Sequence, residues 1–204
     1  MYEALSERHG THVQHCLKQA TVGIMGLGGV GSHLAGSLTR IGVGKMLMAD
    51  YDIVELSNIN RQFYFLSQIG ELKTRALEDN LAAINPFLER EYITEKLIEE
   101  TIPRYFHGVD ILAECFDEPA IKASALRVAL TGLQGIPFVC VSGLAGYGRS
   151  NDIVTREIYS DIFLVGDNRS AVGPGSSLMA PRVAIAANHQ ANQVVKLIIE
   201  RTCE

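Results

Sequence analysis

The sequence predicts an α/β fold: a doubly wound, mainly parallel sheet with an antiparallel C-terminal extension and a closing helix. Three observations support this prediction. Short apolar runs that suit buried parallel strands alternate with segments of helical periodicity. A G-x-G-x-x-G motif joins the first apolar run to the first of these helices. The chain has 204 residues, 47% of them hydrophobic, which is enough for one sizeable core and short for two full domains.

The expected N-terminal elements begin with a βαβ unit. Residues 21–25 form a strand, 32–41 a helix and 45–50 a second strand. Residues 51–69 show neither the strand nor the helix period, and irregular excursions of this length in compact domains are usually functional. Further along we expect helices at 71–84, 98–106 and 119–130, and strands at 90–94, 109–115 and 137–141.

The pattern changes beyond residue 142. A glycine-rich bend at 143–148 precedes two short strands, 152–159 and 162–165, which we expect to be antiparallel. A polar loop at 168–177 leads into a long closing helix at 180–201. No internal repeat or linker divides the chain, so we expect one domain over residues 1–204.

The composition excludes several classes of protein. The formal net charge is −5 and no stretch concentrates Lys and Arg, whereas nucleic-acid-binding proteins usually carry a basic face. No apolar leader and no apolar run of the roughly 18–20 residues that a membrane span needs is present. The four cysteines form no CxxC pair, and Cys115 and Cys140 lie in apolar runs that favour buried thiols. We expect a cytoplasmic protein with neither a nucleic-acid nor a membrane partner.

The glycine motif predicts a nucleotide site in a Rossmann-like fold. Gly26, Gly28 and Gly31 let the backbone turn tightly and approach a phosphate, and the following helix offers free N–H groups at its N-terminus. Asp50 follows Gly31 by 19 residues at the end of the second strand, where a carboxylate can accept hydrogen bonds from ribose hydroxyls. The motif alone indicates an adenine nucleotide, with NAD as the ordinary expectation.

The loop after the second strand carries a more specific motif. The run from Asp50 to Gln62 resembles the D-x-D-x-V-x-x-S-N-x-x-R-Q segment of the ubiquitin-activating-type adenylyltransferases, the family of ThiF and MoeB. The doubled glycine at Gly28-Gly29 and the spacing from Gly70 to Lys73 also fit, and the resemblance covers nearly the whole chain. It implies that the chain uses ATP and Mg²⁺ to adenylate the C-terminal carboxylate of a ubiquitin-like protein.

The chemistry of that reaction explains the residue types. A terminal carboxyl, with a pKa of roughly 3.3–3.7, is already ionised, so catalysis must bring an anion to the phosphate chain of ATP. We assign Arg61 and Lys73 to the β and γ phosphates, with Asn58 positioning the same region. The predicted nucleotide-binding set is Gly26, Gly28, Gly29, Gly31, Asp50, Asp52, Asn58, Arg61 and Lys73.

A carboxylate ligand for Mg²⁺ is expected at the end of the fourth strand. The family's strand typically ends D-x-x-D-N, and Asp117 matches the second Asp, which lies near the metal and the reacting phosphate. Glu114 replaces the first Asp and Glu118 replaces the Asn, so their roles stay open. Asp117 can also cap the helix that begins at Pro119, a role compatible with metal binding.

A homodimer is implied by an arginine near the N-terminus. Family members carry an arginine before the first strand that reaches the γ-phosphate of the neighbouring subunit, and Arg8 is the only arginine upstream of the glycine motif. The closing helix also carries more apolar residues than one core-facing stripe needs. We therefore predict a C₂ dimer in which Arg8 completes the partner's site.

The chain lacks the two CxxC pairs of the zinc-bearing relatives, and its runs 142–148 and 178–183 resemble a short, zinc-free subgroup of thiamine-type enzymes. Its partner would be a ThiS-type sulfur carrier with a Gly-Gly C-terminus. We expect residues of about 20–142 to bind the nucleotide, and about 143–204 to supply the loop for the carrier's tail and the closing helix of the dimer. The alternatives are a MoaD-type carrier, a tRNA-modifying ATP-dependent cyclase, a catalytically inactive partner subunit and an NAD-dependent oxidoreductase. The sulfur donor, the reactivity of Cys203 and the meaning of the His9/His12/His15 spacing stay open.

Overall fold

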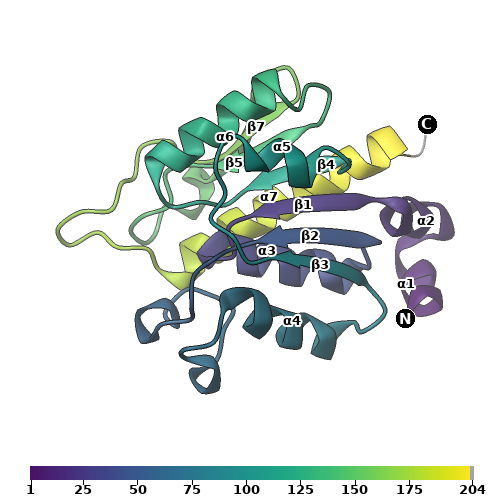
Figure 1. Ribbon diagram of the computed structural model, residues 1–204, viewed down its shortest axis with the longest axis horizontal. Helices are drawn as coiled ribbons and strands as arrows, with labels where there is room; N and C mark the ends of the chain where they lie inside the picture. The colour runs from purple at the N-terminus through teal and green to yellow at the C-terminus, as the bar shows by residue number, and fades with distance from the viewer. Residues whose placement is uncertain (203–204) are drawn as a thin grey trace.

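The fold is built on a twisted sheet of seven strands, seen edge to edge in Figure 1. The computed structural model describes residues 1–202, so Cys203 lies outside the described residues. Across the sheet the order is β3-β2-β1-β4-β5-β7-β6. The strands are β1 (Thr21–Met25), β2 (Lys45–Ala49), β3 (Glu89–Ile93), β4 (Ile111–Glu114), β5 (Phe138–Val141), β6 (Val154–Tyr159) and β7 (Ile162–Gly166).

The strand directions confirm the predicted fold class. Neighbouring strands from β3 through β7 run parallel, and β6 pairs antiparallel with β7 at the edge. The strand order reverses direction between β1 and β4, which makes the gap beyond their carboxyl ends the usual ligand position in a doubly wound sheet.

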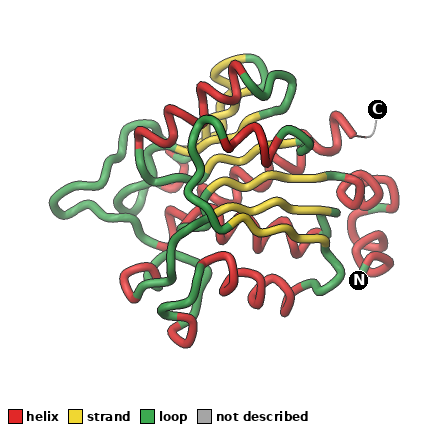
Figure 2. The backbone as a smooth tube through the Cα atoms, viewed as in Figure 1, coloured by secondary structure: helices red, strands yellow, loops and turns green. Residues whose placement is uncertain are grey.

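Helices cover both faces of the sheet, as the tube in Figure 2 shows. Helices α3, α4 and α7 pack with the larger hydrophobic cluster on one face, and α5 and α6 with the smaller cluster on the other. Short 3₁₀ turns lie at Leu56–Asn58, Leu66–Gln68 and Ser150–Asp152. The helices are α1 (Tyr2–His9), α2 (Thr11–Gln19), α3 (Gly29–Ile41), α4 (Lys73–Ile84), α5 (Thr101–Phe106), α6 (Pro119–Thr131) and α7 (Ala180–Thr202).

Three predicted helix starts shift in the structure. Helix α4 begins at Lys73 instead of residue 71. Helix α3 begins at Gly29, three residues before the predicted start, because the glycine turn itself forms its first turn. Helix α5 begins at Thr101 instead of residue 98, since the Thr101 hydroxyl accepts a hydrogen bond from the Ile98 N–H at 3.0 Å and closes a separate turn there.

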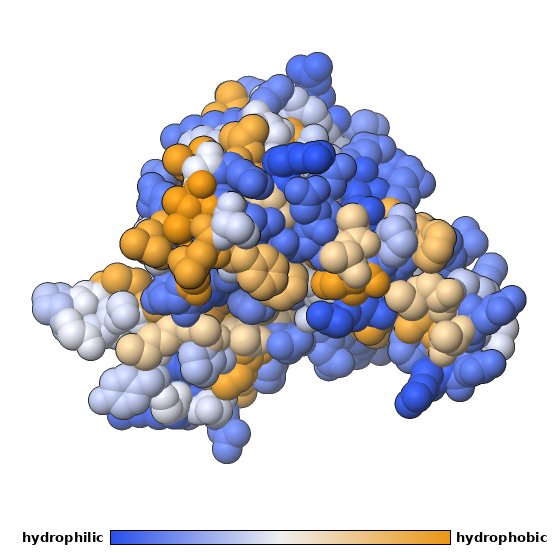
Figure 3. Space-filling view, turned by 90° about the horizontal axis from the view of Figure 1, so that it is seen from below, coloured by the Kyte–Doolittle hydropathy of each residue, from blue (hydrophilic) through white to orange (hydrophobic). Residues whose placement is uncertain are grey.

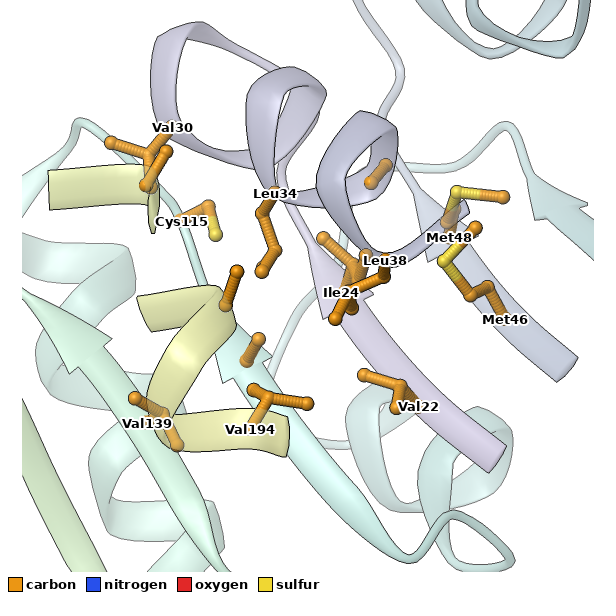
Figure 4. Packing of buried hydrophobic residues seen from close by; sticks show 14 of the residues in the cluster. Val22, Ile24, Val30, Leu34, Leu38, Met46, Met48, Cys115, Val139 and Val194 are labelled. Carbon is orange, nitrogen blue, oxygen red and sulfur yellow. The ribbon is translucent and has the colours of Figure 1, made fainter. Parts of the chain in front are cut away.

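The core under the nucleotide motif is a close-packed apolar layer. Figure 4 shows α3 lying across β1 and β2, with a turn of α7 beside it. The side chains in this layer are Val22, Ile24, Val30, Leu34, Leu38, Met46, Met48, Cys115, Val139 and Val194, all buried. This packing fixes the direction of α3 and therefore the place of its N-terminus.

The closing helix α7 corrects one argument for the dimer. Its apolar residues do not form a surplus face, because Val183, Val194, Leu197 and Ile198 are buried inside the same chain. Helix α7 packs between α3, α2 and the sheet, so it needs more than one apolar stripe. Among the described residues, no helix combines the length and apolarity that a membrane span needs.

Candidate active site

A cavity of about 580 Å³ opens at the carboxyl ends of the central strands. It lies where the strand order reverses, between the segments that follow β1, β2, β4 and β5. Its charged lining residues are Asp50, Asp52, Arg61, Lys73, Glu95, Lys96, Asp117, Glu118 and Lys122. The volume falls in the range of small-molecule sites, and the mixed charges suit an anionic ligand that carries cations with it.

The glycines of the turn have two different roles: some allow close backbone packing, and others line the cavity. Gly26 has a φ of +90°, and a Cβ on Gly31 would lie 1.9 Å from the Gly26 carbonyl oxygen. These two glycines therefore permit the tight approach of α3 to β1. Gly28 and Gly29 line the cavity, and the nearest heavy atom to a Cβ on Gly28 would be the Gln62 side-chain nitrogen at 3.8 Å. The free N–H groups of the first turn of α3 can donate hydrogen bonds to an anion there.

Lys73 lies between two acidic side chains. Its ammonium is 2.7 Å from Asp52 Oδ2 and 3.9 Å from Asp50 Oδ2, and the residue is only 6% exposed. The Asp50 carboxylate also accepts the N–H groups of Leu27, at 2.7 Å, and Asp52, at 2.8 Å. The charge of Lys73 is thus already balanced by carboxylates, which leaves less positive charge for phosphate than its residue type alone suggests.

Like Lys96, Arg61 is a cavity cation that no carboxylate pairs with within residues 1–202, whereas Lys73 and Lys122 are paired. Its guanidinium donates to the Ser57 carbonyl at 3.1 Å and to the Asn60 side-chain oxygen at 2.9 Å. Both partners are neutral, so the charge stays available to an anion.

Asn58 does not line this cavity. Its side-chain oxygen accepts the Glu55 N–H at 3.1 Å and its nitrogen donates to the Ser57 hydroxyl at 3.3 Å. The residue therefore closes the turn that holds Ser57 against the Arg61 guanidinium. The structure gives it a part in positioning Arg61 and no direct place among the ligand-facing groups.

Asp117 and Glu114 lie in opposite environments after β4. Asp117 is exposed, lines the cavity and makes no hydrogen bond or ion pair within residues 1–202. Glu114 is 2% exposed and accepts two hydrogen bonds from Lys122, at 2.9 and 3.1 Å, and one from the Phe116 N–H at 2.6 Å. Burial raises the pKa of Glu114 above its ordinary value, against the opposing effect of Lys122. Asp117 and Glu118 are thus the cavity carboxylates without a side-chain partner within residues 1–202. The predicted capping role of Asp117 is wrong, because the N-cap of α6 is Glu118 and no side chain caps it. Metal binding by Asp117 stays a prediction.

The fit to Mg²⁺ rests on Asp117 and on the ligand's own oxygens. Within the described part of the chain, no group of three or more His, Cys, Asp or Glu side chains forms a metal cluster. Mg²⁺ is commonly held by one or two carboxylates together with substrate phosphates and water, so Asp117, with Glu118 beside it in the cavity, suits it.

Two lining cations escaped the sequence analysis. Lys122 donates to the Val141 carbonyl at 2.8 Å and so joins the ends of β4 and β5. Lys96 lies with its ammonium 5.6 Å from the centre of the Tyr51 ring. Neither lysine belongs to a recognisable motif: Lys122 is an isolated lysine in the predicted helix 119–130, and Lys96 lies in an acidic segment.

Arg8 lies on α1, which together with α2 sits at the amino end of β1, whereas the glycine turn and the start of α3 follow the other end of that strand (Figure 1). The side chain is exposed and does not line the cavity. Within one chain Arg8 therefore does not contribute to the site, and its predicted action across a dimer stays a prediction.

The fold and site define a class: a doubly wound α/β protein with a glycine turn of the nucleotide-binding type and an arginine without a carboxylate partner in the same cavity. The chain belongs to the ThiF family, whose model matches residues 3–204. This membership confirms the resemblance to the wider family that the sequence motif gave.

Among curated relatives, the tRNA threonylcarbamoyladenosine dehydratase of Bacillus subtilis is 37% identical over 133 residues. That match covers 63% of this chain and 51% of the relative, so the chain spans about half of its length. The ubiquitin-like modifier-activating enzyme 5 of Gallus gallus is 49% identical over 94 residues, which cover 46% of this chain and 23% of the relative.

Solved structures share the fold. The E. coli tRNA N6-threonylcarbamoyladenosine dehydratase in complex with ATP has a TM-score of 0.88 at 19% identity, covering 98% of this chain and 94% of that one. E. coli MccB with ATP has a TM-score of 0.74 at 22% identity, covering 96% of this chain and 64% of that one. None of these relatives carries the thiamine-type name that the sequence predicted, so the comparisons support the family and not that particular member.

Proposed function

We propose that this protein is an enzyme that transfers AMP from ATP to a carboxylate and releases pyrophosphate. The observation that carries the proposal is the unpaired Arg61 guanidinium, which lines one cavity together with the N-terminus of α3 and the free Asp117 carboxylate. Phosphates of ATP would meet the N–H groups at Gly28 and Gly29, and Arg61 would bind them bidentately. The ATP complexes of the two structural relatives agree with this choice of nucleotide.

In this reaction an oxygen of the acceptor carboxylate attacks the α-phosphorus. The bond from that phosphorus to the oxygen shared with the β-phosphate breaks, and its electrons leave with pyrophosphate. The chain's own contribution is positioning and charge, since the acceptor is ionised and needs no general base. Mg²⁺, held by Asp117 and phosphate oxygens, would supply the further positive charge that Lys73, paired with two carboxylates, does not.

The nucleoside end of ATP would lie toward β2. Asp50 keeps acceptor capacity for ribose hydroxyls, because a carboxylate has about four acceptor positions and two are used by backbone N–H groups. The buried thiols of Cys115 and Cys140 take no part: burial raises the pKa of Cys140 to about 12, so it stays protonated at neutral pH.

The acceptor is the part of the proposal with two candidates. The relatives named as tRNA threonylcarbamoyladenosine dehydratases favour a carboxylate carried on tRNA over the ThiS-type carrier. The net charge of −5 and the acidic residues at the cavity favour the C-terminus of a carrier protein, of ThiS or MoaD type, because they oppose tRNA phosphates. We put the tRNA acceptor first, and a cytoplasmic location belongs to either version.

ATP–pyrophosphate exchange separates these candidates. Labelled pyrophosphate should enter ATP only when the correct acceptor is present: bulk tRNA carrying the threonylcarbamoyl group, or a carrier protein ending in Gly-Gly. Exchange with tRNA supports the first candidate and exchange with a carrier the second. No exchange with either acceptor, despite tight ATP binding, would indicate an inactive partner subunit. Calorimetric binding of NAD and not ATP would overturn the proposal.

We also propose a homodimer, and the support for it is an exposed apolar surface on the 53–72 loop. The 53–72 loop exposes six large apolar side chains: Ile53, Leu56, Phe65, Leu66, Ile69 and Leu72. Figure 3, which looks at the molecule from the side of this loop, shows apolar side chains gathered on one part of that face. Exposed apolar patches of this kind mark interaction surfaces. The patch adjoins the cavity, because Asp52 and Lys73 at the ends of the loop line it.

A further inference from the structure

Arg182, in the first turn of α7, is buried although it is charged. It is only 3% exposed, and its guanidinium donates to the carbonyls of Gly148, at 2.8 Å, and Arg149, at 3.2 Å. The same group donates to Asp167 Oδ2 at 2.7 Å. Its Nε is buried without a hydrogen-bond partner among the described residues. A buried ion pair contributes little net stability, because removing both charges from water is costly. Net stability alone therefore does not explain why Arg182 is buried here.

Asp167 completes a closed network. Its side chain is 9% exposed and accepts the N–H groups of Arg169 and Ser170, both at 2.8 Å, and the Ser170 hydroxyl. Burial alone would raise the pKa of Asp167, but the hydrogen bonds from Ser170 and Arg169 and the charge of Arg182 lower it to about 2. The Asp167 carboxylate is therefore ionised at neutral pH.

The network ties the start of α7 to the segment just before it and to a bend more distant in the sequence. The three segments are the glycine bend 143–148, the segment 168–178, which we call the arm, and the start of α7. The arm is the loop that extends furthest from the body in Figure 1. The C-terminal end of the arm is also held by the bend, since the Gly146 N–H donates to the Ser177 carbonyl at 2.8 Å.

The bend packs directly against the pair. A Cβ on Gly143, whose φ is +78°, would lie 2.2 Å from Asp167 Oδ1, so only glycine permits this approach.

The bend and the arm form the wall of the cavity that faces the nucleotide groups. The groups assigned to ATP come from the β1–β2 side of the sheet, namely the glycine turn, Asp50 and Arg61. The opposite wall is made of residues 142–145 and 170–172, which follow β5 and β7. ATP on the first side leaves this second wall for the acceptor. Neither Arg182 nor Asp167 lines the cavity itself.

We propose that the Arg182–Asp167 pair is a positioning device that holds the bend and the arm as the wall along which the acceptor carboxylate is aligned with the α-phosphate. This rests on the proposed function. Arg182 and Asp167 act through the wall, so losing them affects the acceptor and leaves ATP binding unchanged. Misalignment of reacting groups by about 1 Å can cost about 100-fold in rate.

Two variants and one control test this. Arg182→Gln and the isosteric Asp167→Asn each break the pair, and Arg201→Gln breaks the exposed Arg201–Asp161 pair on the other end of the same helix. Binding of ATP should stay within about 2-fold in all three. In ATP–pyrophosphate exchange kcat/KM for the acceptor should fall at least about 10-fold in the first two variants and stay unchanged in the control.

Limited trypsin digestion gives a readout that needs no acceptor. Arg169 is an exposed trypsin site in the arm whose N–H is held by Asp167. Cleavage after Arg169 should accelerate about 10-fold in Arg182→Gln and Asp167→Asn, and not in Arg201→Gln. Unchanged cleavage, or equal losses of ATP and acceptor affinity, would overturn the positioning role. If wild-type protein shows no exchange with any acceptor, the proposed function fails, while the digestion still decides whether the pair holds the arm.

Discussion

Replacing Gly28 by alanine should weaken ATP binding by about 10- to 150-fold and leave the fold intact. The new methyl group would find its nearest heavy atom at 3.8 Å, the Gln62 side-chain nitrogen, so it occupies cavity space and not core. A methyl there keeps phosphate from the N–H groups of the first turn of α3. Losing one hydrogen bond to a charged group costs about 1.5–3 kcal/mol, which corresponds to this range of affinity.

Gly31→Ala should instead destabilise the fold. Its Cβ would lie 1.9 Å from the Gly26 carbonyl oxygen, a backbone atom that cannot move without displacing α3 from β1. Overpacking of this severity costs about 3 kcal/mol or more in the free energy of unfolding. Gly28→Ala should change that free energy by less than about 1 kcal/mol.

Calorimetric titration with ATP and Mg²⁺, and urea unfolding followed by circular dichroism, measure the two quantities separately. Gly108→Ala is the matched control, because Gly108 is exposed, has open space around it and lies away from the cavity. Wild-type ATP affinity in a folded Gly28→Ala protein would refute the phosphate-binding role of the turn.

Five further outcomes are expected. Arg61→Ala should reduce acceptor-dependent exchange by about 100-fold or more, and Lys73→Ala should reduce both exchange and stability, because it leaves Asp50 and Asp52 unpaired. Asp117→Ala should abolish exchange with unchanged unfolding, since its side chain is exposed and unpaired; exchange at the wild-type rate would contradict a metal-binding role. Mixing Arg8→Ala with Asp117→Ala should restore about a quarter of wild-type activity through mixed dimers, and no recovery despite proven subunit exchange would exclude action across an interface. Because the fold lowers the pKa of Asp167 from 3.8 to about 2, its ionised carboxylate stabilises the folded state above pH 3.8, and this stabilisation is lost as the pH falls toward 2. Lowering the pH should therefore reduce the free energy of unfolding more in wild type than in Asp167→Asn.

The sequence by itself determined the elements and the nucleotide end of the site. Apolar runs and glycine positions are local properties of the chain, so β1, β2 and β5 appeared within a residue or two of their predicted bounds. The glycine turn and the carboxylate at the end of β2 follow from the same local pattern, since parallel strands bring their carboxyl ends to one edge. The start of α3 was missed because glycines have poor helix propensity, and only packing against Gly26 reveals the extra turn.

Only the tertiary structure decided which charges are free. Lys73 and Arg61 look equivalent in the sequence, yet the fold pairs Lys73 with two carboxylates and leaves Arg61 to neutral partners. It buries Glu114 against Lys122 and leaves Asp117 open, although the two acids lie three residues apart. It also joins Arg182 to a loop that precedes it by 15 residues. These outcomes depend on how packed elements direct their side chains, and packing between distant segments has no local signature in the chain.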